Sequence, residues 1–366
     1  LTITVTSIST PPLPPTPPLS PLPPLNQPPR VNAGLNQLVT LPVTVRSDGS
    51  LSNGTPATVT LNGNVSDDGN PQLTRLITTW RQVSGPQGAS FTNPNAATTT
   101  ATLPRAGRYV MQLVAGDGEL LTSDEVEITV TPRVTQNLQA LYTFAEGSGT
   151  LLRDVSGVGI PLDLTVQNPT AISWLPNGLS VNASTQILTT EPATRLAQAC
   201  IATHEVTIEA WVKPNRADQG NPARIVSLSG GANLRNATLQ QGVWNLSQQR
   251  NQNQYGVRLR TSSTNLDGDP ALLVTTSTPS LDLVHLVYTR TANGTAKLYV
   301  NGIEQASTTV RGDFSNWDVN YRLLLANEVT GDRPWLGEYN LVALYNRALS
   351  ATEVQQNFAS RFGVVA

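Results

Sequence analysis

The segment LVHLVYTRTANGTAKLYVNGIE (283–304) decides the fold that we expect for most of this chain. Apolar and polar side chains alternate on both sides of Ala292-Asn293-Gly294, which is a preferred tight-turn sequence. Alternation with a period of two is the pattern of a strand that buries one of its faces. The segment therefore predicts a β-hairpin within an antiparallel sheet.

Strand patterns of the same kind continue through the rest of the chain. The longer runs include VTIEAWVKP (206–214), ARIVSLSGG (223–231) and YGVRLRTS (255–262). Between residues 30 and 132 the runs are shorter, and turn sequences such as SDDGNPQ, SGPQG and GDGE separate them. A length of 366 residues is enough for two domains. The pattern predicts an all-β protein.

The segment 30–132 carries PPRVNAGLNQLVTLP, LNGNVSDDG, TTWRQVSGP and ATLPRAGRYVMQLVAGDGE in this order. These residues resemble the PKD-type immunoglobulin-like domains of bacterial surface proteins. The resemblance implies a seven-stranded β-sandwich whose buried tryptophan is Trp80.

The segment 138–366 carries ALYTFAEGSGTLLRDVSGVG, VTIEAWVKP and GDRPWLGEYNLVALYNRALSATEVQQNF. It resembles the concanavalin-A-like jelly-roll domains of the laminin-G type, and the resemblance implies a jelly roll. Its tail LSATEVQQNFASRF predicts a helix, because Ser350 and Glu353 have the spacing of a capping box.

The chain opens with an alternating stretch, 1–10, that predicts a lone strand, followed by a proline-rich stalk at 11–29 of polyproline II type. The strand LTITVTSISTPP is similar to VEITVTPRVT (126–135). It is either the last strand of a preceding domain, in a trimmed fragment, or a donor strand that pairs with a sheet of the next subunit. The residues that would link subunits are Leu1, Ile3, Val5, Ile8, Leu13, Leu19, Leu22 and Leu25.

Composition excludes several classes of function. Charged residues make up 13% of the chain and the net charge is -2, so charge gives no reason to expect binding to nucleic acid or to an anionic membrane. The single cysteine, Cys200, excludes an intrachain disulfide and a cysteine-based zinc site. No apolar run is long enough for a membrane span.

Glycoside hydrolysis uses two carboxylates across a cleft, so paired acidic residues are the first candidates for catalysis. Glu205 and Glu209 share one face of a predicted strand, but their sequence context is that of an ordinary core strand. His204 and His285 are the two histidines, and His285 lies in an alternating strand where a structural role is expected. We therefore predict no catalytic residues and no enzyme activity.

The jelly-roll resemblance also implies a Ca²⁺ site, where the first and last strands meet. Its side-chain ligands would be Asp154 and Glu338, completed by carbonyl groups and water. The alternative is that Asp154 caps a turn and that Glu338 is a solvated strand residue.

Aromatic side chains could stack on a sugar ring if they were exposed. The alternative is that the tryptophans pack inside the sandwich, which we expect for Trp317 and Trp335. The candidates for glycan binding are Trp244, Tyr255, Trp317 and Tyr321.

These observations predict a non-catalytic structural subunit of a bacterial surface filament or sheath, located outside the cell or on its surface. Its partners would be copies of itself, joined head to tail through the strand and the stalk. The alternative is a carbohydrate-binding adhesin whose jelly roll recognises surface glycans, with or without Ca²⁺. An accessory module from a larger secreted enzyme is a third possibility.

Overall fold

The computed structural model describes residues 25–41, 44–45, 51–52, 56–71, 75–176, 178–220, 222–245, 250–274 and 279–359. The predicted strand 1–10 and most of the stalk 11–29 lie outside these residues. Leu25 is described, and 83% of its side chain is exposed. The predicted linking residues that lie outside the described part are Leu1, Ile3, Val5, Ile8, Leu13, Leu19 and Leu22.

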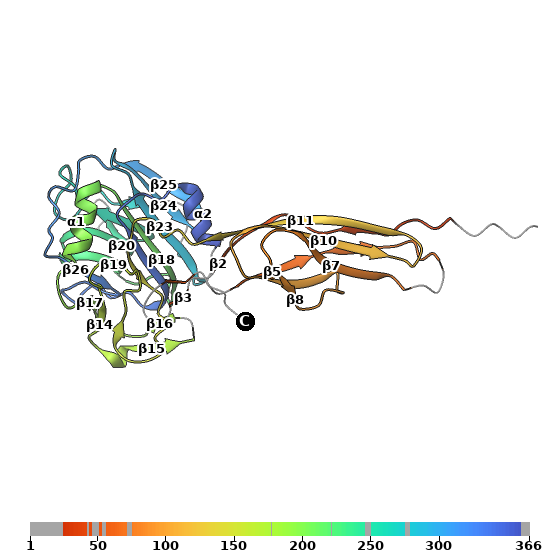
Figure 1. Ribbon diagram of the computed structural model, residues 1–366. Helices are drawn as coiled ribbons and strands as arrows, with labels where there is room; N and C mark the ends of the chain where they lie inside the picture. The colour runs from red at the N-terminus through yellow and green to blue at the C-terminus, as the bar shows by residue number, and fades with distance from the viewer. Residues whose placement is uncertain are drawn as a thin grey trace, which may run out of the picture.

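The first domain is a β-sandwich that forms the long arm in Figure 1. A four-stranded sheet in the order β2-β11-β10-β7 faces a three-stranded sheet in the order β5-β9-β8, and two short pairs, β1-β6 and β3-β4, flank them. The strands are β1 (Arg30–Asn32), β2 (Gln37–Leu41), β3 (Thr44–Val45), β4 (Leu51–Ser52), β5 (Ala57–Asn62), β6 (Asn64–Ser66), β7 (Ile77–Ser84), β8 (Ser90–Phe91), β9 (Thr98–Leu103), β10 (Gly107–Gly116) and β11 (Leu121–Pro132).

Trp80 lies in the core of this sandwich, as the resemblance implied, and is 2% exposed. Its indole Nε1 donates a hydrogen bond to the carbonyl oxygen of Ala97 at 2.9 Å. A side chain at Gly63 would place its Cβ 2.5 Å from that same oxygen and 2.9 Å from the Trp80 ring. Gly63 therefore lets the backbone approach the buried indole closely.

The second domain consists of two eight-stranded sheets. The β18 sheet has the order β15-β16-β27-β18-β23-β24-β25, with β12 also paired to β27, and the β20 sheet has the order β13-β14-β17-β26-β19-β20-β21-β22. The strands are β12 (Leu138–Tyr142), β13 (Leu151–Leu152), β14 (Leu164–Val166), β15 (Ile172–Leu175), β16 (Gly178–Val181), β17 (Ile187–Thr189), β18 (Val206–Pro214), β19 (Ala223–Gly231), β20 (Leu234–Asn245), β21 (Arg250–Leu259), β22 (Leu272–Leu273), β23 (Val284–Arg290), β24 (Thr295–Val300), β25 (Ile303–Thr309), β26 (Arg322–Leu325) and β27 (Gly337–Tyr345).

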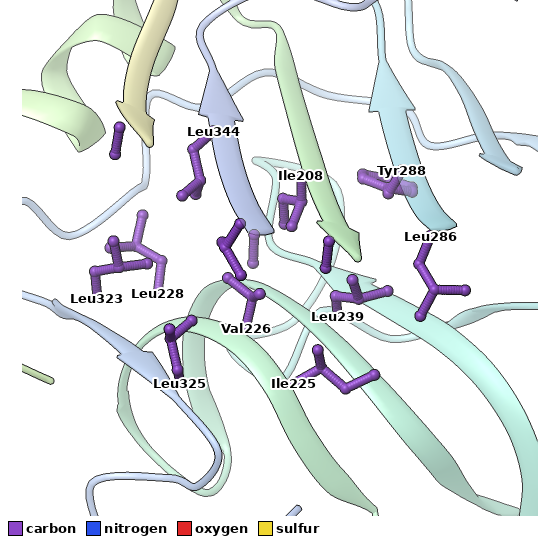
Figure 2. Close-up of a cluster of buried hydrophobic side chains, with 14 of the residues drawn as sticks. Ile208, Ile225, Val226, Leu228, Leu239, Leu286, Tyr288, Leu323, Leu325 and Leu344 are labelled. Atoms are coloured by element: carbon purple, nitrogen blue, oxygen red, sulfur yellow. The ribbon is translucent and has the colours of Figure 1, made fainter. Parts of the chain in front are cut away.

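Apolar side chains from both sheets meet in one core, part of which Figure 2 shows. Ile208 and Leu286 come from the β18 sheet, whereas Leu239 and Leu325 come from the β20 sheet. The alternation along each strand directs these side chains inward, and it is the physical basis of the jelly-roll prediction. The predicted hairpin is confirmed as β23 and β24, with Gly294 at φ +94° in its turn.

Two α-helices and one short 3-10 helix, Pro169–Ala171, accompany the sheets in the described residues. Helix α2 (Ala351–Ala359) confirms the predicted capping box, because the Ser350 amide donates to Glu353 at 2.8 Å and the Glu353 amide donates to the Ser350 hydroxyl at 3.3 Å. Helix α1 (Thr194–Thr203) was not predicted. Its start lacks a side-chain cap, so the usual sequence signal is missing. Within the described part of the chain, neither α-helix has the length and apolar character that a membrane crossing requires.

A short segment after β11 joins the two domains, close to α2 (Figure 1). The backbone amide of Val134 donates to the side chain of Asn357 at 3.0 Å, and Gln356 donates to the carbonyl of Pro132. Arg133 is 2% exposed. The last helix of the second domain thus holds the end of the first domain through polar contacts.

Candidate functional site

A groove on the second domain is the main concave feature that we describe. It has a volume of about 540 Å³ and lies between the loop after β13 and the start of helix α1. Binding pockets for small molecules generally fall between about 300 and 1,000 Å³. The lining residues are Ile160, Pro161, Leu162, Asp163, Thr189, Thr190, Glu191, Pro192, Thr194, Arg195 and Gln198.

Arg195 fixes the two walls of this groove to one another. Its guanidinium donates to the Asp154 carboxylate at 2.9 Å, to the Gln139 carbonyl at 2.7 Å and to the Ile160 carbonyl at 3.1 Å. The Tyr142 hydroxyl donates to the carbonyl of Leu162 at 2.5 Å. These contacts hold the loop in place before any ligand binds, which lowers the entropic cost of binding.

The groove combines apolar surface with side-chain oxygens. Ile160 is 83% exposed, and Pro161 is exposed beside it. Asp163 and Glu191 bring two carboxylates to the lining, and Gln198 brings an amide. The apolar groups can contact the C–H face of a sugar ring, and the oxygens can accept hydrogen bonds from its hydroxyl groups.

The predicted Ca²⁺ ligands do not form a site. Each carboxylate oxygen of Asp154 already accepts two hydrogen bonds, from the amides of Leu141 and Ser156 and from the Leu162 amide and the Arg195 guanidinium. A cation would have to displace the charged guanidinium from this buried carboxylate.

Glu338 lies elsewhere along the same sheet. It pairs with Lys213 at 3.2 Å on β27, whereas the strand that Asp154 contacts, β12, pairs near Ala343 of β27. Five residues along a strand span roughly 16 Å. No group of three or more potential metal ligands occurs within the described residues.

The aromatic candidates are largely inside the domain. Tyr255 and Trp317 are 4% and 5% exposed, and the Trp317 ring stacks on Phe314 with 4.3 Å between their centroids. Trp335 is fully buried and donates to Gln241 at 2.8 Å, so both tryptophans that we expected in the core lie there. These rings present no free face to a sugar.

The two other aromatic candidates differ from these. Tyr321 is half-buried and packs against Gly230, where an added Cβ would lie 2.6 Å from its ring. Trp244 belongs to β20, but its side chain is outside the described part of the structure.

Both carboxylates that were candidates for catalysis make structural contacts. Glu205 accepts hydrogen bonds from the backbone amides of Ala292 at 3.1 Å and Ala348 at 3.0 Å. Glu209 is fully buried and pairs with Arg133 of the domain junction. Contacts of this kind hold loops and domains together.

A buried polar network surrounds Glu209. His285 Nε2 lies 2.8 Å from Glu209 Oε1, and the Asn357 amide donates to Oε2 at 2.9 Å. Burial by itself would raise the pKa of Glu209, but Arg133 and His285 lower it to about 2. Burial lowers the pKa of His285, which keeps the imidazole neutral at neutral pH. No sequence pattern indicates this network, because its members are up to 148 residues apart.

Comparison with known families agrees with this architecture. Residues 33–130 match a family of PKD domains, and residues 188–355 match the concanavalin A-like lectin/glucanases superfamily. The chain therefore carries a PKD-like domain followed by a laminin-G-like, concanavalin-A-like domain. Both resemblances predicted from the sequence are confirmed.

Solved structures share parts of this fold at low identity. A Trypanosoma rangeli sialidase bound to 2,3-difluorosialic acid is 17% identical, with a TM-score of 0.46, over 70% of this chain and 44% of the sialidase. Domain 4 of AbnA, a GH43 extracellular arabinanase from Geobacillus stearothermophilus in complex with arabinotriose, is 17% identical, with a TM-score of 0.37, over 61% of this chain and 98% of that domain. The PKD domain of the KIAA 1837 protein is 23% identical, with a TM-score of 0.20, over 28% of this chain and 85% of that domain. This chain spans less than half the length of the sialidase, and these likenesses concern the fold alone.

Proposed function

We propose that this chain is a non-catalytic, extracellular carbohydrate-binding protein whose second domain binds a neutral glycan in the groove at 160–163 and 189–198. The PKD-like domain acts as a spacer that holds the binding domain away from its point of attachment. The observation that carries the proposal is the groove itself, with its apolar walls and its side-chain oxygens. The match to a family that includes lectins supports it.

The charges that line the groove favour a neutral glycan over an acidic one. Asp163 and Glu191 are acidic, and the one lining cation, Arg195, already contacts Asp154 and two carbonyl groups. A carboxylate or sulfate on the ligand would meet two like charges without a free cation. Uncharged hydroxyl groups can donate to the same carboxylates.

The test is a titration of the full chain with neutral pentose and hexose oligosaccharides, with uronate and sialylated oligosaccharides as the acidic set. Thr190→Trp fills the groove and is expected to weaken binding about tenfold or more. Thr308→Trp places the same side chain at an exposed position on β25 and is the matched control. The proposal fails if no neutral oligosaccharide binds, or if Thr190→Trp and Thr308→Trp bind equally well.

A second proposed function is the head-to-tail assembly that the sequence predicted. Its structural support is an apolar patch on the PKD-like domain, in which Ile77 and Leu121 are 63% and 77% exposed. Both pair with Gly116, so they lie on neighbouring strands across it. Large exposed apolar side chains that lie side by side are typical of contact surfaces.

Electron microscopy and sedimentation of the full chain and of a form without residues 1–10 test this assembly. Filaments that are lost with the deletion support the assembly, and monomers in both samples exclude it. Ile77→Thr with Leu121→Thr tests the patch separately, since these changes leave the N-terminal segment intact.

A further inference from the structure

The outer face of the β20 sheet, which points away from the core, carries buried polar side chains. Ser227 and Ser229 of β19 and Thr238 and Gln240 of β20 are each no more than 1% exposed. Arg224, at the start of β19, is 3% exposed. Polar groups at this depth require hydrogen-bond partners, because a buried group without one costs about 1–3 kcal/mol.

Arg224, Arg235 and Gln240 converge at one place on this face. Arg224 donates to the Gln240 side-chain oxygen, and Arg224 and Arg235 both donate to the carbonyl oxygen of Ala232. Two guanidinium groups therefore lie next to one another, with the Gln240 amide beside them. Repulsion between like charges follows from this arrangement.

The carboxylates nearby only partly compensate these two arginines. Asp267 pairs with Arg235 through one oxygen and with Arg258 through the other. Glu328 accepts hydrogen bonds from Ser229 and from the Val329 amide, and its closest approach to the Arg224 guanidinium is 3.5 Å. Burial and the neighbouring Arg235 lower the pKa of Arg224 to about 9.

The groups that lack a hydrogen bond here are all donors. Among the described side chains they are Nε and Nη1 of Arg235, Nε of Arg224 and Nε2 of Gln240. A water molecule needs acceptors for its own hydrogens as well as donors, whereas an anion accepts only. A cluster of unsatisfied donors beside two guanidinium groups fits an anion.

We propose that a small anion of halide size binds between Arg224, Arg235 and Gln240 on the outer face of the β20 sheet. The burial of these side chains limits the size of the ligand, since none is more than 3% exposed. The anion would separate the two guanidinium groups electrostatically and would accept hydrogen bonds from the free donors. The site is distinct from the groove at 160–163 and 189–198, so it does not depend on the proposed glycan function.

The test measures thermal unfolding of the full chain in sodium bromide and in sodium gluconate at equal ionic strength. Gluconate is too large for the site, so only bromide is expected to stabilise the chain. We expect a saturable rise on the order of 3–6 °C once bromide reaches about ten times its dissociation constant. Equal effects of the two salts would overturn the proposal, because they would reflect general screening.

A variant and a direct observation complete the test. Gln240→Glu supplies a fixed carboxylate, so it is expected to abolish the bromide dependence and to raise the unfolding temperature in gluconate. Gln87→Glu makes the same change at an exposed turn of the first domain and is expected to keep the dependence. Crystals grown in bromide should show anomalous scattering between Arg224 and Arg235, and a water molecule there instead would refute the site even if Gln240→Glu failed to fold.

Discussion

The substitution Arg133→Met tests how the junction between the domains is held. Arg133 and Glu209 form an ion pair in which the two side chains are 1% and 0% exposed. Loss of the guanidinium leaves the Glu209 carboxylate buried, with only neutral partners, and breaking a buried pair costs about 3–5 kcal/mol. The pKa of Glu209 gives a similar value, since a fall from about 4.3 to about 2 corresponds to about 3 kcal/mol.

The assay is urea unfolding followed by tryptophan fluorescence. Trp211 reports on this site, because its ring stacks on His285 with 4.7 Å between the centroids. We expect Arg133→Met and Glu209→Gln each to lower the free energy of unfolding of the second domain by about 3 kcal/mol or more. The double variant should lose less than the sum of the two by at least about 1.5 kcal/mol.

An exposed ion pair provides the control. Arg108 and Glu127 pair across β10 and β11 with the arginine side chain 67% exposed, so Arg108→Met is expected to cost less than about 1 kcal/mol. The reasoning would be refuted if Arg133→Met cost no more than Arg108→Met, or if the two substitutions at the junction were strictly additive.

Three further predictions concern pH, the core and the last helix. Because the pKa of Glu209 is lowered on folding, its contribution is complete above about pH 5 and is lost as the pH falls toward 2. Because the pKa of His285 is also lowered, stability should decline already below about pH 6.5, where only the unfolded chain takes up that proton; urea midpoints measured from pH 7 to pH 3 should show this early decline, and His285→Gln should remove it. Leu325→Ala removes a fully buried side chain and should lower the free energy of unfolding by about 2–5 kcal/mol, whereas Leu281→Ala, at a 52% exposed position, should change it by less than about 0.5 kcal/mol. Ser350→Ala removes the side-chain half of the capping box and should cost about 1 kcal/mol, measured by calorimetry.

Much of the fold could be predicted because its signals are local. Alternation within six to ten residues identified the strands around Trp80 and the hairpin at Gly294. The spacing of Ser350 and Glu353 identified the last helix. Helix α1 was missed, because Ala193 at its start offers no side-chain cap.

The candidate groove could not be predicted by the same means. Its walls come from residues 160–163 and 189–198, and Arg195 joins them through Asp154, 41 residues earlier. No periodicity within one strand indicates which loops from different parts of the chain will lie together.

The sequence by itself determined that this protein is built from strands in two β-domains, because a period of two assigns each side chain to one of two faces. Only the tertiary structure decided what covers each face. Helix α2 and the junction cover the outer side of β18, so Glu209 is a buried ion-pair residue although the sequence placed it on a strand face with Glu205. Packing also placed Tyr255 and Trp317 in the core. The physical reason is that burial depends on the second layer that packs against a face, and that layer comes from distant parts of the chain.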